Sequence, residues 1–117
     1  MERQNQKVKI LGTEWTVKFD TKDSNSLLDN SDGYCDGLAK TIVIEKNCSE
    51  KITQNNEERI RVVTRHEVIH AFLYESGLWT DSLVCEEAWA MNEEMVDWIA
   101  IQFPKIADVC LQLKVFA

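Results

Sequence analysis

Hydrophobic and polar positions alternate near the start of the chain. Trp15, Val17 and Phe19 are separated by single polar residues, which is typical of a strand with one buried face. An apolar run, "VKIL", comes before this strand and is joined to it through Gly12 and Thr13. A glycine in a two-residue connection between such runs favours a tight turn. We therefore expect a β-hairpin in this part of the chain.

The following segments are polar stretches that alternate with periodic apolar runs. Residues 20–33 are rich in Asp, Asn and Ser, which predicts a loop. The β-branched run at 41–44 predicts a strand. A long helix is predicted from near Asn56, with acidic residues in its opening turn, to Gly77, a residue type that commonly follows a helix C-terminus.

The last third of the chain predicts two more helices. One begins at Asp81 or Ser82, which are both good N-caps, and ends just before Pro104. A short helix follows at roughly 105–115. Strands first and helices afterwards predict an α+β fold, with a small antiparallel sheet of about three strands packed against two long helices and a short C-terminal helix. We expect a single domain, 1–117.

Composition narrows the classes of function. The net charge of −7 argues against a protein that binds nucleic acid through a basic surface. No apolar run reaches the length of a membrane span, and the N-terminal sequence lacks the apolar core of a signal peptide, so we expect a cytoplasmic protein without a membrane partner. The cysteines form no C-x-x-C pair and are expected to be free thiols. The tryptophans are expected in or near the core: Trp15, Trp79, Trp89 and Trp98.

The segment "RHEVIH" carries the strongest chemical signal. Its His66 and His70 are the only histidines of the chain, and Glu67 lies between them. Residues four apart on a helix share one face, so two imidazoles at this spacing can bind one zinc ion. Glu67 projects from a neighbouring position, where it can act as a general base toward water without binding the ion. The pattern therefore predicts the zinc-binding helix of a metallopeptidase.

A simpler interpretation places both histidines in the core. At about 100° per residue, His66 and His70 fall in the middle of an apolar arc of the predicted helix, beside residues such as Val62 and Leu73. Two buried imidazoles each need hydrogen-bond partners, and leaving them unpaired costs on the order of 1–3 kcal/mol each. A bound metal removes this cost, which favours the metal site.

A catalytic zinc site needs a third protein ligand and an open position. A third histidine at the long spacing is excluded, because Leu73 and Ser76 stand where that pattern has its glycine and histidine. In the next predicted helix, Glu93 lies at the edge of the widest apolar arc, and Asp97 lies one turn further on. We expect Glu93 to be the ligand and Asp97 to accept the free N–H of a ligating histidine. Glu94 is the alternative ligand.

These segments resemble a known group of enzymes. "RHEVIHAFLYESGL" followed by "NEEMVDWIA" is similar to the gluzincin metallopeptidases, whose second helix carries an N-E-x-x-x-D arrangement that Asn92, Glu93 and Asp97 match. With the strand "TIVIE" ahead of the histidines, the layout resembles the ImmA/IrrE-type metallopeptidase family over roughly residues 37–105. The chain departs from the family pattern at Ile69, where glycine is usual.

The resemblance implies a zincin-like fold and a cleft that binds a protein substrate. Family members are often encoded on phages and mobile elements, and several act on helix-turn-helix repressors, so a repressor is one candidate substrate. The resemblance also implies that the strand at 39–45 borders the cleft, where an extended peptide could pair with it. An interior position in the sheet is the alternative for this strand. The residue that stabilises an oxyanion stays open, with Tyr34 and Tyr74 as candidates.

The sequence thus supports two main hypotheses. The first is zinc-dependent hydrolysis of peptide bonds, with zinc held by His66, His70 and Glu93 and with Glu67 as the general base. The second is a catalytically inactive, zinc-stabilised interaction module of a phage or mobile element. A third and weaker hypothesis is a phage structural protein in which H-E-x-x-H occurs by chance.

Overall fold

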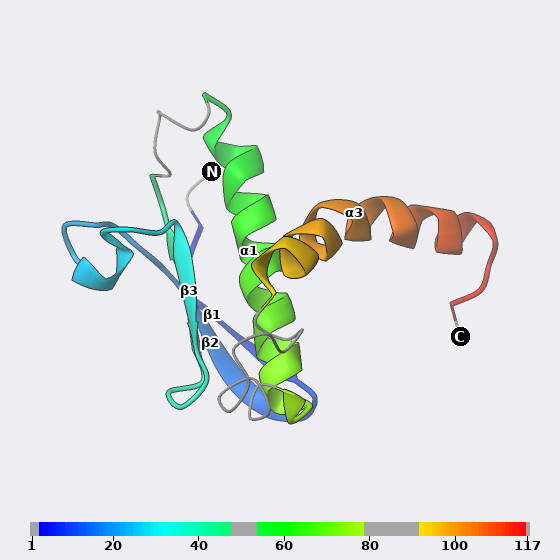
Figure 1. The fold of residues 1–117 in the computed structure, drawn as a ribbon, viewed down its shortest axis with the longest axis horizontal. Coiled ribbons are helices and arrows are strands. Elements are labelled where there is room, and N and C mark those ends of the chain that lie inside the picture. The colour runs from blue at the N-terminus through cyan, green and yellow to red at the C-terminus, as the bar shows by residue number, and fades with distance from the viewer. Residues whose placement is uncertain (1–2, 48–53, 79–91, 117) are drawn as a thin grey trace.

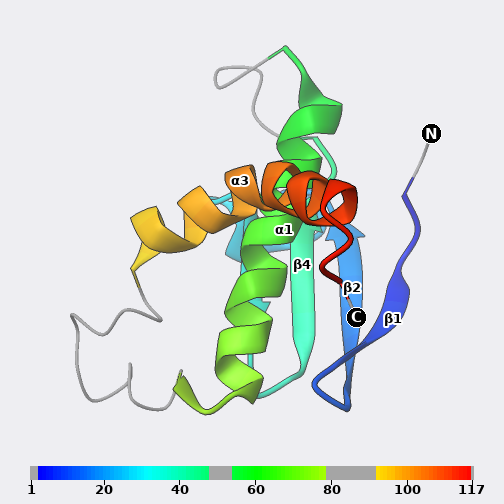
Figure 2. The ribbon, with the colours of Figure 1, turned by 90° about the vertical axis from the view of Figure 1, so that its right-hand side faces the viewer.

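The computed structural model describes residues 3–47, 54–78 and 92–116. These residues form a sheet, a long helix α1 (Asn56–Glu75) that covers one face of the sheet, and a helix α3 (Glu93–Gln112) on the far side of α1 (Figure 1). Figure 2 shows α3 crossing α1 and continuing beyond it. The α+β class is therefore confirmed, and α1 is the central layer.

The sheet is mixed, not purely antiparallel, and the described residues contribute four strands instead of about three. Their order is β1-β2-β4-β3, and β2 and β4 run parallel. The parallel pair arises because β3 and β4 form an antiparallel hairpin that places β4 next to β2. The strands are β1 (Gln6–Ile10), β2 (Thr13–Asp20), β3 (Gly33–Asp36) and β4 (Thr41–Glu45).

The predicted hairpin between β1 and β2 is present, but its turn lies one residue earlier than expected. Thr13 belongs to β2 and pairs with Ile10, so that Leu11 and Gly12 form the turn. Their φ angles are 48° and 87°, which is the left-handed region that a type I′ hairpin turn requires at both positions. Gly12 adopts this conformation without strain, whereas Leu11 does not.

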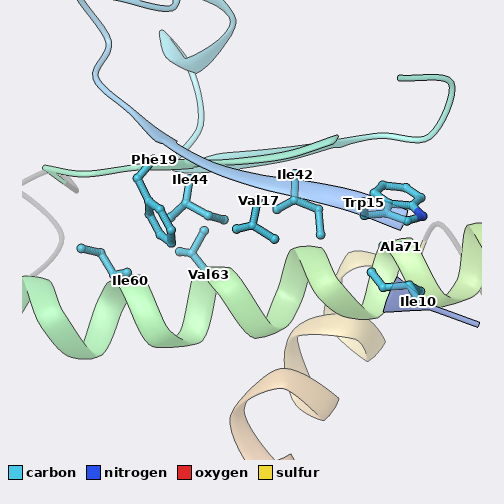
Figure 3. Close-up of a cluster of buried hydrophobic side chains, with 9 residues drawn as sticks. All are labelled: Ile10, Trp15, Val17, Phe19, Ile42, Ile44, Ile60, Val63 and Ala71. Atoms are coloured by element: carbon cyan, nitrogen blue, oxygen red, sulfur yellow. The ribbon is translucent and has the colours of Figure 1, made fainter. Parts of the chain in front are cut away.

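The main core lies between the sheet and α1 (Figure 3). Alternate residues of β2 point toward the helix, as the sequence pattern predicts, and Trp15 is fully buried. The prediction for Trp98 is wrong, because this side chain on α3 is 57% exposed. Trp79 and Trp89 lie outside the described residues. The core side chains are Ile10, Trp15, Val17, Phe19, Ile42, Ile44, Ile60, Val63 and Ala71.

Helix α1 begins and ends where the sequence predicts. The Asn55 side chain caps its first turn by accepting a hydrogen bond from the Glu58 amide at 3.1 Å. The helix ends at Glu75, and Gly77 follows with a φ angle of 91°. A left-handed glycine after the last turn is a common helix terminator.

Helix α3 contradicts two expectations. It runs without a break to Gln112, so the helix stop at Pro104 and the separate helix at 105–115 are both wrong. Pro104 has no N–H for the carbonyl of Ala100, four residues earlier. That carbonyl instead accepts a hydrogen bond from Nε of Arg65 on α1. This contact offsets part of the cost of the proline and ties α3 to α1.

The remaining expectations have mixed outcomes. The expected helix start at Asp81 or Ser82 lies outside the described residues, within which Asn92 caps the first turn of α3. No helix in the described ranges has the length and apolar character needed to cross a membrane. Cys35 and Cys110 are free thiols, as expected. The other two cysteines lie outside the described residues.

Candidate metal centre

Helix α1 brings its two histidines and the intervening glutamate together. His66 and His70 lie one turn apart with their ring centroids 4.8 Å from each other. A potential ligand atom from each of His66, Glu67 and His70 lies within 4.8 Å of the others. His70 and Glu67 are buried, and His66 is partly exposed. The spacing on a regular helix is sufficient to produce this cluster.

Helix α3 supplies the carboxylate that the sequence assigns as the third ligand. One oxygen of Glu93 lies 2.7 Å from Nε2 of His66, and its other oxygen lies 3.0 Å from Nε2 of His70. The two Nε2 atoms are 3.2 Å apart. Glu93 reaches them because Asn92 caps α3 immediately before it, so that the first helical residue faces α1. Glu94, the alternative ligand, is exposed and lines the adjacent cavity.

The separations between these three groups suit a tetrahedral metal ion. Ligand atoms at about 2.0–2.1 Å from a zinc ion in tetrahedral geometry are about 3.3 Å from one another. The observed separations of 2.7, 3.0 and 3.2 Å are all shorter than this value, the shortest by about 0.6 Å. Two imidazole nitrogens and a carboxylate are also a donor set that zinc accepts. His66, His70 and Glu93 therefore fit a zinc ion.

Asp97 determines which nitrogen of His66 is available. Its Oδ1 atom lies 3.0 Å from Nδ1 of His66. Because a carboxylate only accepts hydrogen bonds, the network assigns a proton to Nδ1. In a neutral ring of this tautomer, Nε2 carries the lone pair and could bind a metal ion on the side of Glu93. The position of Asp97 is the one that sequence analysis expects for a residue that orients a ligating histidine.

Glu67 has the environment of a reactive carboxylate. It is 7% exposed, and no hydrogen bond joins it to another residue in the described part of the chain. The pKa of Glu67 is raised to about 7: burial is the largest cause, His66 opposes the increase, and the Glu93 carboxylate adds to it. A carboxylate whose pKa lies near neutrality is suited to accept and return a proton at physiological pH.

Two adjoining cavities open onto these groups. The larger has a volume of about 420 Å³ and extends from His66 and Glu67 toward Asp32 and Arg59. The smaller, of about 220 Å³, lies between the histidines and residues of β3. Gly33, His66, Glu67 and Glu93 line both cavities. The cluster of potential ligands is therefore accessible from a cleft of sufficient size for part of a peptide.

The edge strand β3, which sequence analysis missed, forms one wall of this cleft. A Cβ atom added to Gly33 would lie 2.8 Å from Cγ1 of Val63, so the close approach of β3 to α1 requires glycine. The strand expected at the cleft, β4, is interior and lies between β2 and β3. Nearby, Asp32 accepts a hydrogen bond from Nε of Arg59 at 3.0 Å, which attaches the start of β3 to α1.

The two tyrosine candidates lie in different surroundings. Tyr34 lines the smaller cavity, and its hydroxyl accepts a hydrogen bond from the Asn25 side chain at 2.9 Å. Tyr74 packs edge-on against Trp15 and lies beneath the Lys40 ammonium. Of the two, Tyr34 is the one beside the cluster of ligands.

Comparison with protein-family models, with curated proteins and with solved structures finds no match to this chain. The resemblance to metallopeptidases therefore depends on the sequence motifs, and the cleft adds an arrangement of side chains that can be judged by its chemistry. That arrangement combines two imidazoles and a carboxylate at ligand spacing, with a second carboxylate beside them in a cavity.

Proposed function

We propose that this protein is a zinc-dependent metallopeptidase of the gluzincin type. The observation that carries the proposal is the convergence of Glu93, from α3, on both histidines of α1. Two segments that are distant in the sequence meet with their donor atoms between 2.7 and 3.2 Å apart, close enough to share one ion. If the histidines were only core residues, there would be no need for Glu93, whose side chain is 67% exposed, to approach both rings.

Each residue of the cleft has a defined task in this proposal. His66, His70 and Glu93 hold the ion, and Asp97 keeps the Nδ1 proton of His66 directed away from it. A bound zinc ion supplies Lewis-acid activation of a carbonyl group and of water. Glu67 accepts a proton from the attacking water and returns it to the leaving amine.

The proposed substrate is an extended segment of a protein. Among the described residues no strand pairs with the outer edge of β3, which lies beside the cleft, and an extended peptide can pair with such an edge through its backbone. Sequence-independent pairing of this kind positions a peptide bond without selecting its side chains. A helix-turn-helix repressor is one protein substrate in keeping with the resemblance.

The proposal is tested by metal content and hydrolysis together. Protein purified without chelators should contain one zinc ion per chain, and His70→Ala should lose both zinc and hydrolysis of an unfolded protein substrate. Glu67→Gln should keep zinc and lose hydrolysis by about a thousandfold, because general acid–base catalysis contributes about 10²–10⁴ to rates. Glu94→Gln is the matched control and should keep both properties.

Different results identify the alternatives. Stoichiometric zinc with equal hydrolysis by the wild type and Glu67→Gln on every substrate would remove the catalytic claim and favour a zinc-stabilised interaction module. Zinc well below one ion per chain would remove the metal site itself.

A further inference from the structure

Arg59 of α1 is the only arginine or lysine among the described residues that line the larger cavity of the cleft. Its side chain is 31% exposed, and its Nε atom donates a hydrogen bond to Oδ2 of Asp32 at 3.0 Å. A guanidinium group has several N–H donors, and in Arg59 the Nε donor alone has a partner among the described residues. The donors on the two Nη atoms of Arg59 are therefore available to a ligand in the cavity.

The position of Arg59 on α1 relates it to the metal centre. Arg59, Val63 and Glu67 follow one another at intervals of four residues, and all three line the larger cavity. This spacing places them on one side of the helix, with each about 6 Å further along the axis than the one before. Arg59 and Glu67 are thus separated by about 12 Å, which an extended peptide spans in roughly three to four residues.

The strand β3 leaves this cavity open toward a bound peptide. Gly33 of β3 lies opposite Val63, which points from α1 toward the sheet (Figure 3), and a Cβ atom at Gly33 would lie 2.8 Å from Cγ1 of Val63. Paired residues on neighbouring strands direct their side chains to the same face of a sheet. A substrate residue paired beside Gly33 would therefore direct its side chain toward α1 and into the cavity that contains Arg59.

The acidic residues of the cavity leave the Nη donors of Arg59 without a partner. Asp32 contacts Nε of Arg59, whereas Glu93 and Asp97 contact the histidines of α1. Glu94 also lines the cavity but forms no ion pair with Arg59. A carboxylate that a substrate brings can pair with the two Nη atoms in the bidentate geometry that a guanidinium group favours.

We propose that Arg59 is a specificity-determining residue that binds a carboxylate of the substrate within about three residues of the scissile bond. The carboxylate is that of an Asp or Glu side chain or of the peptide C-terminus, which present the same group to a guanidinium. Asp32 has a positioning role, because its hydrogen bond fixes the direction of the Arg59 side chain. The inference rests on the proposed function, since it names a class of substrate for the same cleft.

The first test maps the bonds that the protein cleaves. Reduced, unfolded casein is digested with the zinc-loaded full chain, and the products are identified by mass spectrometry. Asp or Glu should be enriched at one position within about three residues of the cleaved bond. Peptides based on one cleaved site, with Glu, Gln or Lys at this position, should show a kcat/KM about tenfold higher for Glu than for Gln, because a charged hydrogen-bond partner contributes more than a neutral one.

The C-terminal group of the same peptides separates the two sources of the carboxylate. Each peptide is prepared with a free C-terminus and with a C-terminal amide. If Arg59 binds the C-terminus, amidation should lower kcat/KM by about tenfold, and the cleaved bonds should lie close to chain ends. If Arg59 binds a side chain, amidation should have no effect, and replacement of Glu by Gln in the peptide should cause the loss.

Substitutions at position 59 test the residue itself. Arg59→Gln should abolish the preference for Glu over Gln, although glutamine can still donate a hydrogen bond toward Asp32. Arg59→Lys should keep part of the preference, because lysine retains the charge but not the bidentate geometry. Arg61→Gln is the matched control, since Arg61 is on the same helix, is 48% exposed and pairs with Glu58. It removes the same charge and should leave the ratio between substrates unchanged, as would a purely structural role of Arg59.

Binding separates a failure of this inference from a failure of the proposed function. The probe is a blocked peptide of alternating Ala and Val with a single Glu, Gln or Lys at its centre. Calorimetric titration of zinc-loaded Glu67→Gln with each peptide measures the preference without turnover. The Glu peptide should bind about tenfold more tightly than the Gln peptide, and addition of Arg59→Gln should remove the difference. This preference without hydrolysis by the wild type would contradict the proposed function and retain the role of Arg59.

Three results would overturn the role of Arg59. These are equal cleavage and binding of the Glu and Gln peptides, a preference for the Lys peptide through the acidic residues of the cavity, and a preference for Glu that persists in Arg59→Gln. Hydrolysis without any preference for a carboxylate would overturn this role and leave the proposed function intact.

Discussion

Two glutamates on α1, Glu67 and Glu75, occupy opposite electrostatic environments. Glu75 is partly buried and accepts hydrogen bonds from Lys40 and from Nε1 of Trp15, both at 2.8 Å, and from Thr13 at 3.2 Å. These contacts, led by the hydrogen bond from Lys40, lower its pKa. Glu67 lies two turns earlier, has no such donor among the described residues, and has a pKa raised to about 7.

The difference shows how one helix separates structural from chemical tasks. The carboxylate of Glu75 accepts hydrogen bonds from Trp15 of β2 and from Lys40 in the turn before β4. It therefore joins both segments to the end of α1. Glu67 lines both cavities beside His66 and Glu93. Desolvation by burial is the leading cause of the raised pKa of Glu67, whereas the hydrogen bond from Lys40 is the leading cause of the lowered pKa of Glu75.

Of the changes that test this difference between Glu67 and Glu75, metal removal should have the largest effect on stability. Zinc at about a thousand times its dissociation constant should stabilise the protein by about 4 kcal/mol, and a chelator should remove that gain. Thermal unfolding with and without zinc measures it. His70→Ala should be insensitive to zinc, whereas Glu75→Gln should keep the full zinc-dependent shift. A zinc response that persists in His70→Ala would place the ion elsewhere.

Truncation of Glu75, near the C-terminal end of α1, should cause the second-largest loss of stability. Glu75→Ala leaves the indole N–H of fully buried Trp15 without its acceptor and removes the partner of Lys40. An unsatisfied buried donor costs about 1–3 kcal/mol, so urea denaturation should show a loss of about 3 kcal/mol. Glu67→Gln should lose little stability or gain some, because it replaces a buried carboxylate that lacks donors. Equal losses in both variants would contradict the distinction.

The contact between Arg65 and α3 provides a smaller test, since Glu93 reaches the histidines only while α3 is packed on α1. Arg65→Ala should cost about 1.5 kcal/mol, because it leaves the Ala100 carbonyl without a donor. Pro104→Ala restores an N–H for that carbonyl within α3 itself. A double-mutant cycle should therefore show that Arg65→Ala costs less when residue 104 is alanine. Additive losses would mean that the two sites are not coupled.

The smallest effect concerns pH. The pKa of Glu75 in the folded protein lies below its ordinary value of 4.5. Glu75 therefore stabilises the fold fully above about pH 4.5, and this contribution is lost as the pH falls through the folded-state pKa. Denaturation midpoints between pH 6 and pH 3 should fall more steeply for the wild type than for Glu75→Gln. Parallel curves would show that Glu75 has no such linkage.

Local sequence signals predict α1, β4 and the alternating face of β2 correctly. Each of these elements carries its own periodicity and, in α1, a cap and a terminating glycine. Glu93 also lies on the side of its helix that the apolar pattern predicts, because it borders the face that packs on α1. The assignment of Glu93 over Glu94 agrees with the contacts to both histidines.

The errors concern features that depend on distant partners. The strand β3 is short and partly polar, and its conformation is set by pairing with β4 and by the approach of Gly33 to Val63. The parallel pairing of β2 and β4 depends on the path of the intervening chain. The Ala100 carbonyl that Pro104 leaves without a donor is satisfied by Arg65, which lies 39 positions before Pro104 in the sequence. No local pattern contains this information.

The turn between β1 and β2 has a practical consequence for anyone who works with this protein. Leu11 is 61% exposed and adopts a φ angle of 48°, a conformation that asparagine accepts far more readily than leucine. Leu11→Asn creates the Asn-Gly pair preferred in this turn and should raise the free energy of unfolding by somewhat under about 1 kcal/mol. Thermal unfolding would show the gain. Destabilising replacements in the cleft could then be made in the Leu11→Asn protein, where the resulting variants would stay folded and could be measured.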